Sequence, residues 1–581
     1  MPTLRTQRIR VMICCLLFIS VVSCGGTDDS QKPTPTPAAQ SNLPGEPTAA
    51  PSPQPTVTPS PQLTAQQDAQ RMVVLLNYLQ IALLKVAHYQ DRVMLDGEYR
   101  HLLTNIKLST ISDQALVAFL NAMAEQFKPF LLTDQERRLL DQQYQEFVVK
   151  AIYADYARQT AQQPGLPMSC AAAALVRIGA FHEHYRQHLA EYRQALDKSV
   201  WELPAEALQV IRNSQSQFSE MYWRFIKQHQ LPDTLNPSED RIQQLIKLLD
   251  EQDQEKRLRL LQDMQTDFAA FPPLWHALAS LTAQILQPQD ALPLYQKFDE
   301  ANINAFKYDH ESAEVLMERL LLNEADMNTQ ETLQHIIALS PDDWRKNLFV
   351  AFQAMKHADY QTARDLIRKN RDFDKDESLH LRVLGEIEAA ALEEQALEQL
   401  FSQMFANANI RYQDMLGLLG QIRGGAFLQK QLDAYLKPAI APISFALDTA
   451  LIYGEDELTI SFPAIWFRSR KNAASVSAGI VGESKEILPS DPKNIQQEHD
   501  PVTLTFPGLF KAKELLKNNG HKTMWLNISD HLQTSSLFVD ISVKDVNGKP
   551  AIVFEKTQLA VGGICYAVSG STWDRKPTCE F

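Results

Sequence analysis

The stretch "LSPDDWRKNLFVAFQAMKHADYQTARDLI" (Leu339–Ile367) carries the pattern that decides the fold of the central region. Pro341 precedes a first apolar run, in which Ala351 is a small residue among bulky ones. Ala363 and Ile367 lie one helical turn apart in a second run. Apolar residues at spacings of three and four mark amphipathic helices. The stretch therefore predicts two helices that pack together, with a small residue where they cross.

An earlier stretch, "WHALASLTAQILQPQDALPLYQKF", shows the same arrangement. It begins at Trp275 and continues with Leu278, Ala279, Ala291 and Tyr295. In the later stretch, Tyr360 opens the second helix. This arrangement resembles the tetratricopeptide repeat, whose two helices carry a bulky residue, a small residue at their crossing, then an alanine and an aromatic residue. The resemblance implies a stack of helix pairs that binds peptides or proteins.

A third copy follows at the family's period of about 34 residues. Adding this period to Ala351 and Ile367 gives Gly385 and Phe401, and Leu384 precedes the glycine. Leu397 stands where the family would have alanine, and the unit between the first two copies is stretched. We predict tetratricopeptide-like helical repeats over 236–437, with a generic helical array as the alternative.

The residues before the repeats predict an irregular α-helical bundle over 64–235. A seam of apolar residues opens this region at spacings of four and three: Met72, Leu76, Leu79, Leu83 and Val86. "TDQE" (Thr133–Glu136) has the form of a capping box and predicts the start of another long helix.

The residues after Pro438 change to short β-rich runs. "DELTISFPAIWFRS", "DPVTLTFPG", "KTMWLNIS", "SSLFVDISVKDV" and "AIVFEKTQLAV" are separated by turn residues, which predicts strands. Asn547-Gly548 is a strong hairpin signal, since both residues tolerate positive φ. "VGGIC" predicts a strand bend or bulge. We expect a β-rich, sandwich-like C-terminal domain over 438–581.

The first residues predict an exported protein. Arg5, Arg8 and Arg10 form a basic leader before the apolar run "VMICCLLFISVV". That run is too short to span a bilayer, which takes about 20 residues, but it suits a secretory signal.

The end of this run, Val21-Val22-Ser23-Cys24, resembles the lipobox of bacterial lipoproteins. The resemblance implies a signal peptide at 1–23, cleavage before Cys24, and acylation of that cysteine on its sulfur and its new amino group. Gly25 favours the outer membrane where the cell has one. Two or three acyl chains would anchor the protein stably. The alternative is an ordinary signal peptide with an incidental cysteine.

The segment 24–63 holds the acylated cysteine and a Pro-rich disordered linker. Ten prolines lie between Lys32 and Leu63, among Thr, Ser and Ala, and such composition favours extended polyproline II. At about 3.1 Å per residue this linker could reach roughly 90 Å. The body of the protein would then work at a distance from the membrane.

The net charge and the cysteines indicate which partners and which disulfide to expect. The 581-residue chain has a formal charge of −14, and loss of the three leader arginines takes it to −17. An acidic chain without a basic stripe argues against nucleic acid as a partner. After export, Cys170, Cys565 and Cys579 remain beside Cys24. We predict a Cys565–Cys579 disulfide and a buried, free Cys170.

The sequence offers only weak candidates for metal-binding, sugar-binding or catalytic residues. His184, His188 and Glu191 share one helix face at a spacing that could bind zinc, but the HExxH pattern fails and no third distant ligand is evident. Trp466 and Trp573 could be sugar-stacking platforms, although core or surface aromatics are the simpler interpretation. The sequence contains no GxSxG elbow. We predict no cofactor, no metal and no catalytic site.

These patterns together predict a mainly α protein: an irregular helical bundle, a tetratricopeptide-like α-solenoid and a smaller C-terminal β-rich domain. We expect a membrane-anchored lipoprotein on the periplasmic or extracellular side. It would act as a protein-interaction scaffold for other proteins or peptides of the cell envelope. The alternative is a cell-envelope enzyme or carbohydrate-binding protein that uses the β domain.

Overall fold

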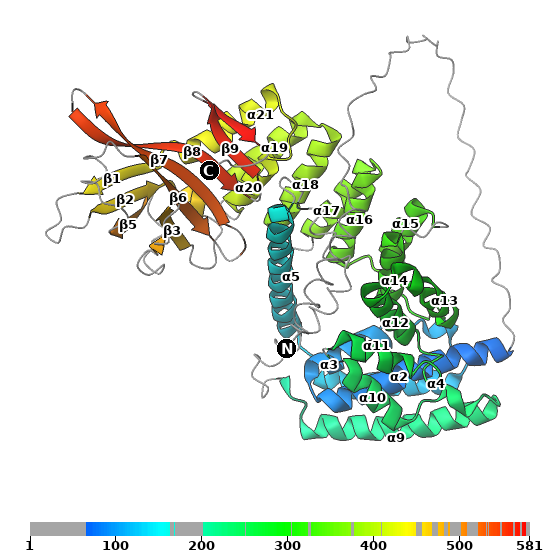
Figure 1. Ribbon diagram of the computed structural model, residues 1–581. Coiled ribbons are helices and arrows are strands. Elements are labelled where there is room, and N and C mark those ends of the chain that lie inside the picture. Colours follow the sequence, from blue (N-terminus) through cyan, green and yellow to red (C-terminus); the bar gives the residue numbers. More distant parts are fainter. Residues whose placement is uncertain are drawn as a thin grey trace, which may run out of the picture. The chain divides into compact units, whose positions relative to one another are not determined.

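The computed structural model describes most of the chain after the Pro-rich segment (Figure 1). The described residues are 65–162, 168, 201–249, 251, 253–303, 305–322, 327–372, 377–407, 410–448, 456–467, 475–481, 486–487, 501–507, 521–529, 532, 534–546, 549–561, 564–569 and 572–576. The predicted signal peptide, Cys24 and the Pro-rich linker lie outside these residues.

The first described helices form a bundle with one hydrophobic core. Side chains such as Leu76, Leu120, Phe218 and Tyr222 meet in this core. Aspartate side chains cap two of the helices, as is common at helix starts. The bundle helices are α2 (Ala65–Tyr89), α3 (Arg92–Glu98), the π-helical turn η1 (Tyr99–Leu103), α4 (Gln114–Phe127) and α9 (Ala205–Gln228).

Helix α2 contains a segment, Ala69–Tyr89, that is long and apolar enough to cross a membrane by composition alone. Most of its residues are buried inside the bundle, and Leu75, Leu76 and Leu79 are almost fully covered. The apolar side chains of α2 are therefore mostly buried in the interior of the protein.

The long helix α5 (Asp134–Gln162) begins at the predicted capping box. The Thr133 N–H donates to Glu136 Oε2 at 2.7 Å, and the Glu136 N–H donates to Thr133 Oγ1 at 3.3 Å. The second half of α5 does not join the bundle core. Val148, Val149 and Ile152 belong instead to the core of the repeats. The predicted 64–235 region therefore includes a helix that packs mainly elsewhere.

The central region is a row of helix pairs. Asp253, Asp309, Asn328 and Asp343 each cap one helix of the row by accepting a hydrogen bond from its first turn. The helices are α10 (Glu239–Leu249), α11 (Gln254–Gln262), α12 (Pro272–Ile285), α13 (Leu292–Ala301), α14 (His310–Leu321), α15 (Thr329–Leu339), α16 (Trp344–Lys356), α17 (Tyr360–Asp372), α18 (Glu377–Ala391), α19 (Glu394–Ala406), α20 (Tyr412–Leu419), α21 (Ala426–Gln431) and α22 (Lys437–Ile440).

The C-terminal region forms two antiparallel sheets. One has the strand order β1-β2-β5 and the other β10-β9-β8-β7-β6-β3-β4. The strands are β1 (Ser444–Asp448), β2 (Glu457–Phe462), β3 (Ser475–Ile480), β4 (Glu486–Ile487), β5 (Val502–Pro507), β6 (His521–Ser529), β7 (Thr534–Val546), β8 (Lys549–Val561), β9 (Ile564–Ser569) and β10 (Thr572–Lys576).

Alternate residues of both sheets meet in a shared core. Ile460 of β2, Leu526 of β6 and Val539 of β7 are fully buried members of this core. Phe445 of β1 stacks on Phe554 of β8, with ring centroids 5.0 Å apart. Two sheets that interdigitate in this way form a β-sandwich.

Two local expectations in this region need correction. "AIWF" is not part of a strand, because β2 ends before Pro463 and Ala464–Phe467 forms a 3₁₀ turn. "VGGIC" is not a bend or bulge within one strand, because Val561 of β8 pairs with Ile564 of β9. Val546 of β7 pairs with Lys549 of β8, as the expected hairpin requires. The four residues between these pairs, Asn547, Gly548, Gly562 and Gly563, lie outside the described residues.

The repeats and the sandwich share one continuous hydrophobic core. The Tyr566 hydroxyl of β9 donates to the Leu416 carbonyl of α20 at 2.5 Å. The Trp466 indole N–H donates to the Ala439 carbonyl of α22 at 2.9 Å. The chain is mostly helical with a C-terminal region of two sheets, which confirms the predicted fold class.

Candidate functional site: the inner face of the repeats

The first helices of three successive units, α16, α18 and α20, share a surface that we call the inner face. Stacked helix pairs offer such an extended surface to their partners. Here it carries buried charges: Arg382 of α18 and Asp414 of α20 are completely covered, and Glu386 is 3% exposed. Charged side chains are almost never buried without partners. Helix α5 supplies several of those partners.

Tyr153 of α5 is bound by the N-terminal turn of α20. Its hydroxyl donates to Asp414 Oδ1 at 2.6 Å, and the Arg411 guanidinium lies 4.1 Å from the centre of its ring. Asp414 Oδ2 accepts from Arg411 Nε and from Ser378 Oγ, both at 2.7 Å. Oδ1 of this buried carboxylate also lies 3.4 Å from Arg382 Nη1, so α5 supplies the shorter of its two hydrogen bonds.

Tyr156, one turn further along α5, is bound by α18. Arg382 Nη2 donates to its hydroxyl at 2.6 Å, and the guanidinium lies 4.7 Å from the ring centre. A Cβ at Gly417 of α20 would come within 2.7 Å of the Arg382 guanidinium, so this glycine makes room for it. Glu386 pairs with Arg382 at 3.5 Å and accepts from the Met168 N–H at 2.7 Å. The chain thus meets α18 again after α5 ends.

A third contact reaches α16. Arg345 Nη1 donates to the Tyr144 hydroxyl of α5 at 2.6 Å. Arg345 is itself held by Asp343, with Nη2 and Oδ2 2.7 Å apart. Three tyrosines of α5 therefore contact the first helices of three successive units.

The charges of this cluster are fixed near neutral pH. Burial alone would raise the pKa of Asp414, but attraction from Arg411 and Arg382, with hydrogen bonds from Tyr153 and Ser378, holds it below its usual range. Burial raises the pKa of Tyr156. These shifts favour an ionised Asp414 and a neutral Tyr156 at neutral pH.

A second buried cluster lies between α12, α13 and α14. His276 Nδ1 is 3.2 Å from Glu311 Oε1, and His276 Nε2 is 3.3 Å from Glu318 Oε2. Glu318 also accepts from Tyr295 Oη at 2.6 Å. Tyr78 of α2 reaches Glu311 at 3.5 Å, so the bundle contacts α14 at this point.

The pKa values in this second cluster favour an ion pair. Burial alone would lower the pKa of His276, but attraction and hydrogen bonds from Glu318 and Glu311 raise it well above its ordinary value. Burial alone would raise the pKa of Glu318, but the His276 charge and hydrogen bonds from His276 and Tyr295 lower it. The buried imidazolium therefore bridges two carboxylates of α14.

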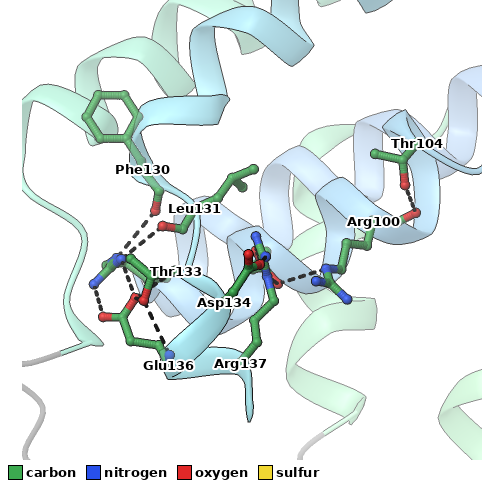
Figure 2. A network of polar contacts seen from close by, with 10 residues as sticks. Arg100, Thr104, Phe130, Leu131, Thr133, Asp134, Glu136 and Arg137 are labelled. Carbon is green, nitrogen blue, oxygen red and sulfur yellow. Dashed lines mark hydrogen bonds and ion pairs between the residues drawn. The ribbon is translucent and has the colours of Figure 1, made fainter. Parts of the chain in front are cut away.

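The start of α5 is tied to the bundle by a polar network, shown in Figure 2. Arg92 donates to Glu136 Oε1 and to the Leu131 carbonyl, each at 2.9 Å. Arg137 Nη2 donates to Asp96 at 3.1 Å. One end of α5 is thus bound to the bundle and the other to the repeats.

The repeat positions proposed from sequence all lie in or beside these helices. Apart from Tyr360, they are buried: Trp275, Leu278, Ala279, Ala291, Tyr295, Ala351, Ala363, Ile367, Leu384, Gly385 and Phe401. Tyr360 is half-buried at the start of α17. A Cβ at Gly385 would come within 2.2 Å of Leu418 Cδ2, so α18 and α20 approach closely at this residue.

Several other proposed residues lie outside the described part of the chain: Cys24, Cys170, Cys579, His184, His188 and Glu191. Cys565 is buried and disulfide-bonded. Its pairing with Cys579 stays a prediction. Among the described residues, no group of His, Cys, Asp and Glu side chains is arranged to hold a metal ion.

Burial excludes Trp466 as a sugar-stacking platform. Trp466 is 1% exposed and packs edge-on against Tyr412 of α20, so no sugar could stack on it. It fills the junction between the repeats and the sandwich because its apolar ring and its single N–H donor both find partners there. Trp573 of β10 is half-buried against the same core.

The binding of α5 by the repeats is not among the sequence predictions. Its signal in the sequence is the helix "ESLHLRVLGEIEAAA", in which Arg382, Glu386 and Glu388 interrupt an apolar run. Every residue from Ser378 to Ala389 is buried. Such charges indicate partners on other elements, although the sequence does not name them.

Searches of protein-family models, curated proteins and solved structures find no match to this chain.

Proposed function

We propose that this protein is a membrane-anchored lipoprotein whose helical repeats act as a protein-interaction scaffold. The observation that carries the proposal is the seating of α5 on the inner face. Arg382, Arg411 and Asp414 bind the tyrosines of a helix there through cation–π contacts and hydrogen bonds. Stacked helix pairs offer extended surfaces, and helices are common partners of such grooves. Anchorage rests on the lipobox resemblance at Cys24.

The position of α5 also limits where a partner binds. Because α5 covers α16, α18 and α20, a partner that approaches this side meets the outward side of α5 first. That side carries Arg138, Gln142, Glu146 and Lys150, which are exposed, and Leu139, which is 49% exposed. Mixed charges around one apolar residue suit a polar, reversible protein contact.

Site-specific photocrosslinking in intact cells tests this proposal. A photoreactive amino acid replaces Arg138 or Lys150 on α5, and a matched control replaces Gln217, which is exposed on the bundle helix α9. We expect a discrete protein adduct from the α5 positions and none from Gln217. The scaffold proposal is contradicted by the same adducts from all three positions, or by no protein adduct from α5.

A further inference from the structure

The seven-stranded sheet is packed on one face. Ile564 and Tyr566 of β9 contact α20, and Lys556 of β8 donates to the Ile440 carbonyl of α22 at 3.0 Å. Leu526 of β6 and Val539 of β7 join the sandwich core on this same face. Successive residues of a strand point to opposite faces. The alternate residues of β3, β6 and β7 therefore form a second surface, which we call the outer face.

The strand register arranges the outer face as three rows. The middle row is Gly479, Trp525 and Phe538, which lie directly opposite one another on β3, β6 and β7. On one side lie Ser477, Asn527 and Ser536, and on the other Thr523 and Asp540. An aromatic row is thus flanked by short hydrogen-bonding side chains.

Trp525 lies across the neighbouring strand. A Cβ at Gly479 would come within 2.4 Å of Trp525 Cζ2 and 2.9 Å of its Nε1. The indole therefore covers the Gly479 backbone, which only a glycine permits. It is half-buried, so part of the ring stays accessible beside Gly479.

The flanking polar groups are oriented by their neighbours. Ser536 Oγ donates to Asn527 Oδ1 at 2.6 Å, which leaves the two N–H groups of the Asn527 amide as donors. Thr523 Oγ1 donates to Asp540 Oδ1 at 2.8 Å, and the other carboxylate oxygen remains an acceptor, 3.8 Å from His521. Fixed donors and acceptors on both sides of a ring provide specificity for a polar ligand.

We propose that the outer face binds a neutral glycan, with one sugar ring stacked on Trp525 and its hydroxyl groups hydrogen-bonded to Asn527 and Asp540. A sugar ring has an apolar C–H face and polar edges, which match the aromatic row and the two polar rows. The carboxylate of Asp540 disfavours an anionic ligand beside it. A purely apolar ligand would bury the Asn527 N–H groups and the second Asp540 oxygen without giving them hydrogen bonds, which is unfavourable.

Binding to two soluble probes, chitohexaose and cellohexaose, tests this site by calorimetric titration of the full mature chain carrying Cys24→Ser. We expect saturable binding of at least one hexasaccharide. Trp525→Ala should weaken that binding at least tenfold, and Asn527→Ala several-fold. Trp573→Phe is the matched control, a tryptophan change on β10 that should leave affinity unchanged.

The alternative is that Trp525 packs on Gly479 only to stabilise the sheet, and this alternative predicts different results. In that case Trp525→Ala lowers the unfolding temperature, and neither hexasaccharide binds the unsubstituted chain. Absence of binding to both probes overturns the proposal, as does undiminished binding by Asn527→Ala and Trp525→Ala. Should Trp525→Ala fail to fold, Asn527→Ala decides, because it changes an accessible side chain. None of these outcomes depends on the scaffold proposal, whose readout is protein crosslinking.

Discussion

At the scale of single residues, the decisive contacts are those of Tyr153 and Tyr156. The Tyr153 hydroxyl donates a hydrogen bond to Asp414, and the Tyr156 hydroxyl accepts one from Arg382. Both charged groups are completely buried. Hydrogen bonds to charged groups contribute more than neutral ones, and a buried charge left short of a partner is costly. The two tyrosines are therefore specific anchors as well as apolar surface.

Replacement of these hydroxyls should destabilise the protein measurably. We expect Tyr153→Phe and Tyr156→Phe each to lower the free energy of unfolding by about 1–3 kcal/mol, because a buried charged group loses a partner. Tyr435→Phe is the control, since its hydroxyl meets Ser402 at the surface. That change should stay within about 0.5 kcal/mol. Urea unfolding of the three variants measures the difference, and equal effects would refute the role of the buried pairs.

The His276 cluster predicts a pH dependence with a definite sign. A raised folded pKa stabilises fully below the unfolded pKa of about 6.5, and this contribution declines as pH rises towards the folded value. The lowered pKa of Glu318 adds stability above about 4.3, which is lost as pH falls through its folded value. The cluster should therefore contribute most between about pH 4.3 and 6.5.

His276→Gln tests this sign. Urea midpoints of the variant and the unsubstituted chain should differ most near pH 6 and converge as pH rises well above 6.5. Facing groups on the packed elements, Glu311, Glu318, Tyr295 and Tyr78, are unchanged in this comparison. A difference that grows as pH rises towards about 6.5 and stays constant above it would show that His276 is neutral in the folded protein.

At the scale of elements, the close approach of α18 and α20 rests on Gly385. Adding a methyl group there should destabilise by about 1–3 kcal/mol, because Leu418 and Leu400 must move. Gly97→Ala is the matched control: it lies in α3 with nothing within 4 Å, and alanine favours a helix. Thermal unfolding should rank Gly385→Ala below the unsubstituted chain and Gly97→Ala level with or above it. The reverse order would show that the repeat register is wrong.

The sequence predicted helices and strands better than it predicted which of them pack together. Gly385 lies where α18 and α20 approach closely, and β7 pairs with β8 on either side of Asn547-Gly548, because such features depend on local spacing and turn chemistry. Periodicity shows that α5 has an apolar face, but nothing in it says that this face packs against residues more than 200 positions away. The 3₁₀ turn after Pro463 was missed for a related reason: β-rich composition describes burial as well as strand formation.

At the scale of the whole molecule, one hydrophobic core runs from α5 through the repeats into both sheets. Arg575 of β10 adds a bond to the Ile422 carbonyl at 2.6 Å, and Lys556 adds another to the Ala441 carbonyl at 2.9 Å. The repeats and the sandwich therefore contact each other through apolar packing and through hydrogen bonds to helix carbonyls.

Membrane attachment should depend on one residue. Cys24→Ser should leave the precursor without acyl groups and shift the protein from the membrane fraction to the soluble fraction, since the chain has a formal charge of −14 and would be repelled by anionic lipid. Metabolic labelling with a fatty acid and cell fractionation measure both effects. Normal labelling and membrane retention in the variant would defeat the lipoprotein assignment.

The seating of α5 on the inner face is the central claim, and amide hydrogen exchange of the mature chain tests it most directly. Peptides that cover Val148–Tyr156 should be protected to nearly the same degree as those of α18, because both belong to one core. Tyr153→Phe with Tyr156→Phe should reduce protection in α5 while the bundle helix α9 keeps its own. Exchange of Val148–Tyr156 at the rate of an exposed helix, with α18 still protected, would contradict the account.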